Sequence, residues 1–137
     1  MTVLIIEESL LIGGRIRSML LESGNTTAVY KSVEHKEAAL LFEEIEPEIV
    51  LLDMCLPGTM SIELLQTIKN TSAKITIVVL VNCEDYQKQL KCKSIGVDYI
   101  IDKYHEFEKI PVIIDYIVSN RSTKSCNEKS KSYSKFA

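Results

Sequence analysis

The stretch from Ile49 to Gly58 constrains the fold of this chain more than any other part of it. Its first four residues, Ile49-Val50-Leu51-Leu52, are all apolar and therefore predict a strand that is buried on both faces of a sheet. Asp53 follows this run, and Pro57-Gly58 is a strong turn signal that ends the stretch. Because open α/β sheets collect their functional groups at the carboxyl ends of the strands, Asp53 is a candidate functional carboxylate. The alternative is an aspartate that only caps the strand or its turn.

Segments with the apolar pattern of a strand alternate five times along the chain with segments that have the apolar pattern of a helix. Short β-branched runs predict strands at residues 2–6, 26–32, 49–53, 75–81 and 98–102. Helical periodicity predicts five helices, which begin after a Ser9 N-cap, at Ala38, after a Ser61 N-cap, at Glu84 and at Ile110. The helix from Glu84 to Ile95 is only weakly amphipathic, and Tyr86 and Leu90 are its expected buried contacts. Parallel strands need crossover helices, so we predict an α/β fold: a doubly wound, five-stranded parallel sheet with helices on both faces, of the flavodoxin-like type.

Length and composition predict one domain followed by a tail. A chain of 137 residues, 46% of them hydrophobic, can bury one full core, which we assign to residues 1–118. Residues 119–137 are rich in Ser and Lys and lack apolar periodicity, so we expect a disordered C-terminal tail. A solubilising or linker role is favoured over a basic arm that binds nucleic acid or an acidic partner.

Charge and cysteine usage exclude several classes of protein. The net charge of −3 argues against nucleic acid as a partner of the folded domain, because phosphate backbones are bound through basic surfaces. No apolar run approaches the roughly 20 residues needed to span a bilayer, so we expect no membrane anchor. The four cysteines have no metal-ligand spacing, and no signal peptide precedes the first apolar run. We therefore expect a reducing, cytoplasmic location.

Three strand ends bring four charged side chains to one edge of the predicted sheet. Glu7 and Glu8 follow the first strand, Asp53 the third and Lys103 the fifth. Clustered carboxylates repel one another unless a divalent cation joins them, and Mg²⁺ takes oxygen ligands while leaving positions for phosphate. A lysine beside them can pair with phosphoryl oxygens. The pattern matches the needs of phosphoryl transfer, where positioning and charge neutralisation supply most of the catalysis.

Three segments of residues 2–118 resemble, in order and spacing, the receiver domains of response regulators in two-component signalling. They are Glu7-Glu8, the segment Leu52 to Gly58, and the segment Gly96 to Lys103. The resemblance implies a stand-alone, chemotaxis-regulator-like receiver that is not an enzyme. It implies that Asp53 accepts a phosphoryl group from a histidine kinase or phosphotransfer protein, that Lys103 binds the phosphate, and that Mg²⁺ is held by Glu7, Glu8, Asp53 and the backbone carbonyl of Cys55. A downstream protein partner is expected on the fourth helix, fifth strand and last helix.

Departures from the family pattern bear on metal binding and switching. Both members of the acidic pair are Glu, where most receivers have at least one Asp, so weak metal affinity is expected. Val81 stands at the Ser/Thr position and has no hydroxyl to bond a phosphoryl oxygen. Ile100 stands at the aromatic switch position, with Tyr99 on the opposite face of the strand. The alternative function is therefore a degenerate, receiver-like module that binds partners without phosphorylation-driven switching.

Two neighbouring substitutions add to these departures. Tyr104 follows Lys103 where many receivers have proline, which removes the usual reason for a cis peptide. Asn82 is larger than the small residues usual after the fourth strand and could crowd the mouth of the site.

Other site classes fit the sequence less well. A flavin binder needs a glycine- and hydroxyl-rich phosphate loop after the first strand, and Glu7-Glu8 would repel phosphate there. A dinucleotide fold is weaker still, because Gly13-Gly14 lies within a helix and no Gly-x-Gly-x-x-Gly occurs. His35 and His105 are isolated and are expected to be surface residues.

A redox role for the thiols is a further alternative. Cys55 and Cys83 both lie in loops at the carboxyl edge of the predicted sheet, but we favour thiols that are buried or merely adjacent to one another.

Overall fold

The computed structural model describes residues 1–24, 28–55, 60–72 and 74–123. Strands and helices alternate along it in the predicted order. The elements are β1 (Thr2–Ile6), α1 (Leu10–Ser23), β2 (Ala28–Ser32), α2 (His35–Ile45), β3 (Ile49–Asp53), α3 (Met60–Thr71), β4 (Thr76–Val81), α4 (Tyr86–Ile95), β5 (Tyr99–Asp102), the 3-10 turn η1 (Phe107–Lys109) and α5 (Ile110–Thr123).

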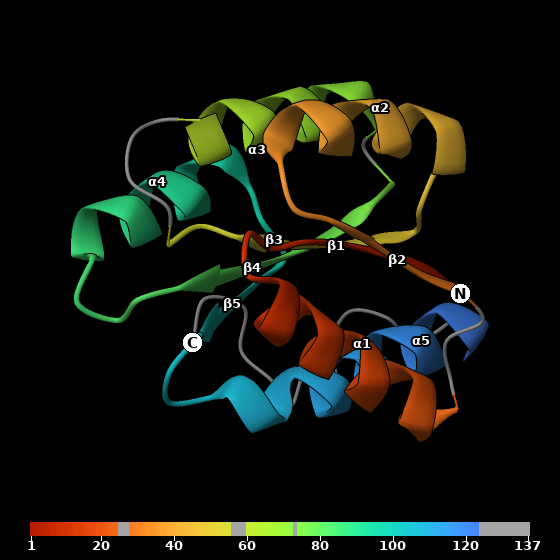
Figure 1. Cartoon of the computed structure of the whole chain (residues 1–137). Coiled ribbons are helices and arrows are strands. Elements are labelled where there is room, and N and C mark those ends of the chain that lie inside the picture. The colour runs from red at the N-terminus through yellow and green to blue at the C-terminus, as the bar shows by residue number, and fades with distance from the viewer. Residues whose placement is uncertain (25–27, 56–59, 73, 124–137) are drawn as a thin grey trace.

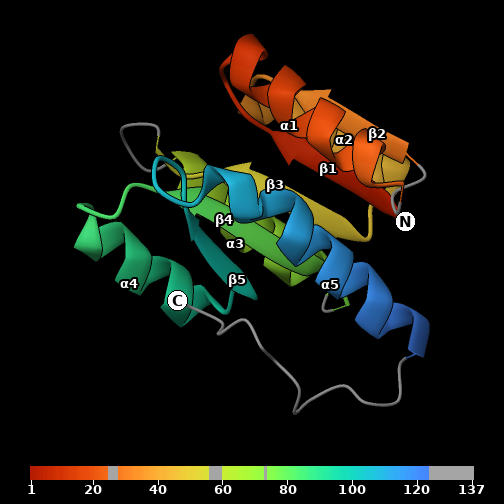
Figure 2. The same cartoon turned by 90° about the horizontal axis from the view of Figure 1, so that it is seen from below.

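The five strands form one parallel sheet in the order β2-β1-β3-β4-β5, with β3 at its centre. Helices α1 and α5 cover one face of the sheet, and α2, α3 and α4 cover the other (Figure 1). In Figure 2, which is seen from the α1 and α5 side, α4 lies near β5 at one edge of the sheet, far from β2. The predicted doubly wound α/β fold is confirmed.

The core consists of two apolar clusters, one on each face of the sheet. All five residues of β3 are buried, as the run of apolar residues predicted. Leu52, Val79 and Ile100 belong to the cluster beneath α2, α3 and α4, whereas Leu51 and Tyr99 belong to the cluster beneath α1 and α5. Ile100 and Tyr99 therefore face opposite sides of the sheet, as strand alternation requires.

The predicted helix boundaries hold at three positions. The Ser9 hydroxyl accepts a hydrogen bond from the Ile12 N–H at 3.2 Å and caps α1. Gly24 and Gly96 end α1 and α4 in the left-handed conformation, with φ angles of 80° and 101°. Glycine is favoured there because a Cβ atom destabilises that conformation.

Two details of the helices α3 and α5 differ from prediction. Ser61 is the second residue of α3 and not its N-cap; it is buried, and its hydroxyl donates to the Asp53 carbonyl oxygen at 3.4 Å. Helix α5 continues to Thr123, past the domain boundary expected at residue 118, and residues 124–137 of the expected tail lie outside the described residues. Among the described helices, none combines the length and apolar character required to cross a membrane.

The predicted buried contacts of α4 are wrong. Tyr86 is 64% exposed and Leu90 is 42% exposed, while Cys92 is fully buried. The side of α4 that faces the protein contains Lys88, Cys92 and Ile95. Ile95 packs on the core, and Lys88 donates a hydrogen bond to a backbone carbonyl. Because a lysine interrupts this inward side, its apolar periodicity is too weak to be recognised in the sequence.

Candidate functional site

Sheet register places Glu7, Asp53 and Lys103 at the carboxyl edge of the sheet, after β1, β3 and β5. Ile6 of β1 lies opposite Leu52 of β3, so Glu7 follows directly beside Asp53. The Glu7 N–H donates to the Ser32 carbonyl at 3.0 Å, which continues the β1–β2 ladder beyond β1. The backbone therefore holds the Glu7 side chain at the end of the central strands.

Lys103 reaches the same place from two strands away. Val81 pairs with Asp102 at the end of the β4–β5 ladder, and the Lys103 N–H donates to the Val81 carbonyl at 2.8 Å. Val81 thus positions Lys103 through its backbone, whatever its side chain.

The three side chains form a buried ionic cluster. The ammonium Nζ of Lys103 lies 3.2 Å from Asp53 Oδ2 and 3.2 Å from Glu7 Oε1. It donates hydrogen bonds to Asp53 Oδ2 and to Glu7 Oε2. Glu7, Asp53 and Lys103 are 3%, 2% and 8% exposed, so water screens these charges little. Of the four side chains predicted to meet at this edge, Glu7, Asp53 and Lys103 converge at one site.

Burial and the neighbouring charges change the pKa values of Glu7 and Lys103 in this cluster. Burial raises the pKa of Glu7 above its ordinary value, and the charge of Asp53 raises it further; the Ser9 N–H and Lys103 act in the opposite direction. Burial lowers the pKa of Lys103, but Asp53 and Glu7 together outweigh burial and leave it raised. Lys103 is therefore a permanent cation at neutral pH, placed against two acids.

Cys55 lies next to this cluster. Its N–H donates to Asp53 Oδ1 at 2.9 Å, so both oxygens of the Asp53 carboxylate have partners. Burial, followed by the charge of Asp53, raises the pKa of the Cys55 thiol to about 12. The thiol stays protonated at neutral pH, which argues against the redox alternative at this residue. Residues 56–59, which include Pro57-Gly58, lie outside the described residues.

Glu8 lies apart from the cluster. Its side chain is exposed and makes no hydrogen bond or ion pair with the rest of residues 1–24, 28–55, 60–72 and 74–123. Glu7, the first residue after β1, occupies the buried position. The sequence could not distinguish the two acids, because one residue of difference at a strand end moves a side chain to the other side.

The donor set fits a hard divalent cation. Glu7 Oε1 is buried and has no hydrogen-bond partner, because its approach to Lys103 Nζ lacks hydrogen-bond alignment. A buried carboxylate oxygen without a hydrogen bond is costly, and direct ligation of a metal ion would satisfy it. Two carboxylates and a backbone carbonyl are the oxygen ligands that Mg²⁺ accepts alongside phosphate and water. Glu7 and Asp53 therefore fit the predicted ion better than the exposed Glu8 does.

The predicted switch positions are apolar and buried. Val81 is 2% exposed at the end of β4, and Ile100 is 7% exposed in β5. Both belong to the apolar cluster beneath α2, α3 and α4. Neither side chain offers a hydroxyl to the site.

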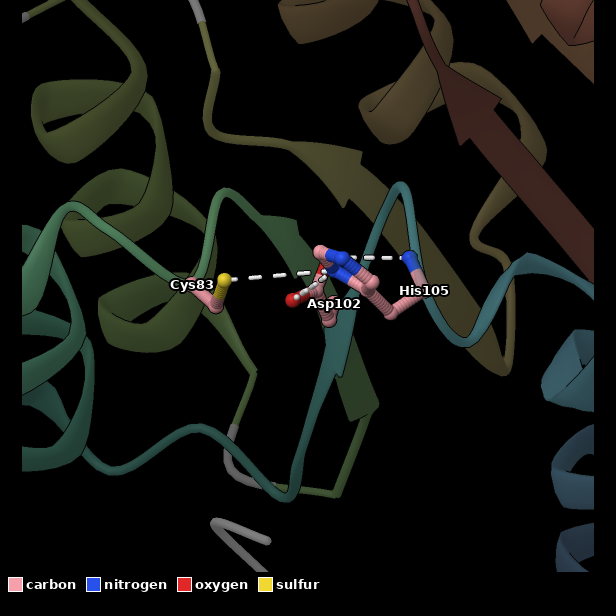
Figure 3. Close-up of side chains that lie close together, drawn as sticks. All are labelled: Cys83, Asp102 and His105. Carbon is pink, nitrogen blue, oxygen red and sulfur yellow. Dashed lines mark hydrogen bonds and ion pairs between the residues drawn. The ribbon is translucent and has the colours of Figure 1, made fainter.

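Two contacts near the site were not predicted. Lys88 of α4 donates to the Met54 carbonyl at 2.8 Å, which ties α4 to the segment after β3. Cys83, Asp102 and His105 converge beside the end of β5 (Figure 3). His105 is exposed, as expected, but it is not isolated. The spacing Asp102-x-x-His105 directly after a strand was the signal available for the second contact.

Comparisons with known proteins agree on one family. The family model of the response regulator receiver domain matches residues 3–115. The transcriptional regulatory protein PhoP of Escherichia coli is 24% identical over 110 residues, which are 80% of this chain and 48% of PhoP. The virulence transcriptional regulatory protein PhoP of Salmonella typhi matches to the same extent. The chain thus spans about half the length of the curated relatives it matches.

Solved structures share the fold. A CheY-like receiver domain protein from Methanospirillum hungatei superposes with a TM-score of 0.78 at 16% identity, covering 90% of this chain and 98% of that one. The receiver domain of RcsB from Salmonella enterica serovar Typhimurium, determined with the phosphomimetic BeF3-, gives 0.77 at 16% identity, with 87% and 88% covered. At these identities the likeness establishes the fold alone.

Proposed function

This chain belongs to the response regulator receiver domain family, and on that premise we propose that Asp53 accepts a phosphoryl group from a histidine kinase or phosphotransfer protein. Receiver domains are signalling modules of two-component systems rather than classical enzymes. The observation that carries the proposal is the buried contact between Asp53 Oδ2 and Lys103 Nζ at the end of the central strand.

The transfer proposed is a displacement at phosphorus. A carboxylate oxygen of Asp53 forms a bond to the phosphorus of a phosphohistidine, while the phosphorus–nitrogen bond breaks and its electron pair stays on the imidazole. The imidazole takes up a proton from solvent as it leaves, so the products are an acyl phosphate on Asp53 and a neutral histidine on the donor. Lys103 then moves its hydrogen bond from Asp53 Oδ2 to a phosphoryl oxygen, and so keeps the added charge paired.

We propose that Glu7, Asp53 and the backbone carbonyl of Cys55 hold the Mg²⁺ that the family implies. Support comes from the buried Glu7 Oε1, which has no hydrogen-bond partner. When bound, Mg²⁺ neutralises charge on the phosphoryl oxygens. The exposed Glu8 is assigned a supporting role in attracting the ion, and not the direct ligand role given to Glu7.

We propose that output runs through protein contacts on α4, β5 and α5, and that the protein acts in the cytoplasm. The outer side of α4 presents the exposed Tyr86 and Leu90, which can bury apolar surface in a partner. A cytoplasmic location accords with the free thiols of Cys55, Cys83 and Cys92. The acidic net charge favours protein partners over nucleic acid for the folded domain.

Phosphate acceptance is favoured over a constitutive interaction module. Val81 and Ile100 lack hydroxyls, but they bear on the response that follows phosphorylation and not on the transfer itself. The contact between Asp53 and Lys103, the groups to which we assign the transfer, supports this choice.

The proposal is tested by incubation with a small phosphodonor such as acetyl phosphate and Mg²⁺, followed by intact-mass measurement. We expect the wild type to gain one phosphoryl mass and Asp53→Asn to gain none. Asp115→Asn in α5 is the matched control and should label like the wild type. Equal labelling of wild type and Asp53→Asn would remove Asp53 from the role.

A further inference from the structure

A second group of metal-ligand atoms lies outside the Asp53 cluster. Cys83 follows β4, Asp102 ends β5, and His105 lies in the turn after β5, so the three lie at the carboxyl ends of two neighbouring strands (Figure 3). His105 Nδ1 lies 3.0 Å from Asp102 Oδ2 and 3.9 Å from Cys83 Sγ. All three ligand atoms lie within 4.8 Å of one another.

We propose that Cys83, Asp102 and His105 form a binding site for Zn²⁺ or a similar transition-metal ion. Thiolate, imidazole and carboxylate are the three ligand types that Zn²⁺ takes in proteins. Sulfur and nitrogen ligands select against Mg²⁺, which prefers oxygen. The site is therefore chemically distinct from the Mg²⁺ site proposed at Asp53, and it goes beyond phosphate acceptance.

The two ligand separations that involve His105 Nδ1 fit a tetrahedral ion. Zinc bond lengths of about 2.3 Å to sulfur and about 2.0 Å to nitrogen or oxygen imply ligand separations of about 3.5 Å for S···N and about 3.3 Å for N···O. The observed separations of 3.9 Å and 3.0 Å lie within a few tenths of an ångström of those values. The His105 side chain is 72% exposed, so its ring can turn by the small amount required.

The carboxylate is already fixed for this role. Asp102 Oδ1 accepts hydrogen bonds from the N–H groups of Tyr104 and His105 at 2.9 Å and 3.1 Å, which leaves Oδ2 directed at the imidazole. Hydrogen bonds of this kind orient a metal ligand and limit the cost of binding. The same contacts hold the turn together without a metal, so binding needs a direct test.

Three protein ligands leave the fourth position to water. The Cys83 thiol releases its proton to solvent when the metal binds. Because Cys83 and His105 are exposed, the ion can enter directly from solvent.

Metal binding would join two loops that flank the phosphate-accepting site. Cys83 is two residues beyond Val81, and Asp102 is next to Lys103. A bound ion would tie the β4–α4 loop to the loop after β5. The site would therefore restrain the segments nearest to Val81 and Lys103 in response to transition-metal supply.

A cobalt titration tests the proposal on the whole chain. Co²⁺ substitutes for Zn²⁺, and its thiolate complexes absorb in the near ultraviolet. We expect one equivalent of Co²⁺ to produce this band, Zn²⁺ to abolish it, and millimolar Mg²⁺ to leave it unchanged. Cys83→Ser should lose the band, and Asp102→Asn or His105→Gln should weaken Co²⁺ binding by at least about tenfold.

Matched controls come from the other histidine and from a cysteine of the tail. The chain has only two histidines, and His35→Gln removes the one that is not assigned as a ligand. Cys126→Ser likewise removes a thiol that is not assigned as a ligand. Both variants should keep the band. A band that survives in Cys83→Ser, or no band in the wild type, would overturn the proposal.

A second measurement uses the wild type alone and does not depend on how the variants fold. Saturating Zn²⁺ should slow alkylation of Cys83 by iodoacetamide at least about tenfold, as mapped by peptide mass. Unchanged alkylation of Cys83 under saturating Zn²⁺ would likewise exclude the site.

Discussion

Lys103 Nζ lies 3.2 Å from Asp53 Oδ2, although strand β4 separates the strands from which the two side chains come. The lysine side chain must therefore pass across the carboxyl end of β4 to reach the carboxylate. Val81 ends β4 at this point, and its carbonyl holds the Lys103 N–H. The contact is possible only because the three strands end at nearly the same level.

Removal of the Lys103 charge should destabilise the metal-free protein strongly. In Lys103→Gln the carboxylates of Glu7 and Asp53 remain buried without a cation, and breaking a buried ion pair costs about 3–5 kcal/mol. Urea unfolding measures the loss. The double variant with Lys103→Gln and Asp53→Asn should recover much of the stability that Lys103→Gln alone loses. If the effects of the two substitutions on stability were simply additive, the two charges would not be coupled.

The Glu7 carboxyl should make stability depend on pH. Its raised pKa means that its contribution is full below the ordinary value of 4.5 and is lost as pH rises through the folded-state pKa. In chelator-treated buffer, Glu7→Gln should therefore gain stability over the wild type as pH rises from about 4 to about 8. Urea unfolding across this range measures the difference.

Magnesium should reverse that difference, because only the ionised wild-type carboxylate can ligate it. A wild-type advantage should appear at neutral pH when millimolar Mg²⁺ is present. If the difference in unfolding free energy between wild type and Glu7→Gln changed with neither pH nor Mg²⁺, the role given to Glu7 would be contradicted.

Lys88 should hold α4 against the segment after β3. Its hydrogen bond to the Met54 carbonyl is a charge-assisted contact worth about 1.5–3 kcal/mol. Lys88→Met should therefore speed hydrogen exchange of the α4 amides at least about tenfold, with the strands unaffected. Lys91→Met, an exposed lysine on the same helix, is the control and should exchange like the wild type. Equal exchange in both variants would show that the contact does not stabilise α4.

Phosphorylation should be poorly coupled to conformational change, because Val81 cannot bond a phosphoryl oxygen and Ile100 has no polar tip. A ligand shifts a two-state equilibrium only through contacts that differ between the states. The missing hydrogen bond to a charged group is worth about 1.5–3 kcal/mol, enough to leave the population divided.

Val81→Thr tests this coupling. The substitution should enlarge the chemical-shift changes in α4 and β5 when a beryllofluoride mimic is added. Large, saturating changes already present in the wild type would show that the protein switches by another route.

The fold and the main cluster could be predicted because they depend on periodicity. Alternating strands and helices determine a parallel sheet, and a parallel sheet brings the ends of β1, β3 and β5 to one edge. Asp53 and Lys103 therefore followed from the sequence without any knowledge of side-chain positions.

The remaining features depend on local geometry that periodicity does not contain. A difference of one residue at the end of β1 determines whether Glu7 or Glu8 is the buried carboxylate beside Asp53. The inward side of α4 contains Lys88, whose partner is a backbone carbonyl and leaves no apolar pattern. The meeting of Cys83 with His105 depends on the path of two loops and on a turn that the Asp102 carboxylate stabilises.

Borohydride trapping tests the central claim most directly, because reduction of an aspartyl phosphate leaves homoserine at the labelled residue. The protein would be treated with acetyl phosphate and Mg²⁺, reduced, digested and sequenced by mass spectrometry. Our account predicts homoserine at position 53 and at no other aspartate. Homoserine elsewhere, or an unmodified Asp53 beside a phosphorylated control receiver, would contradict it.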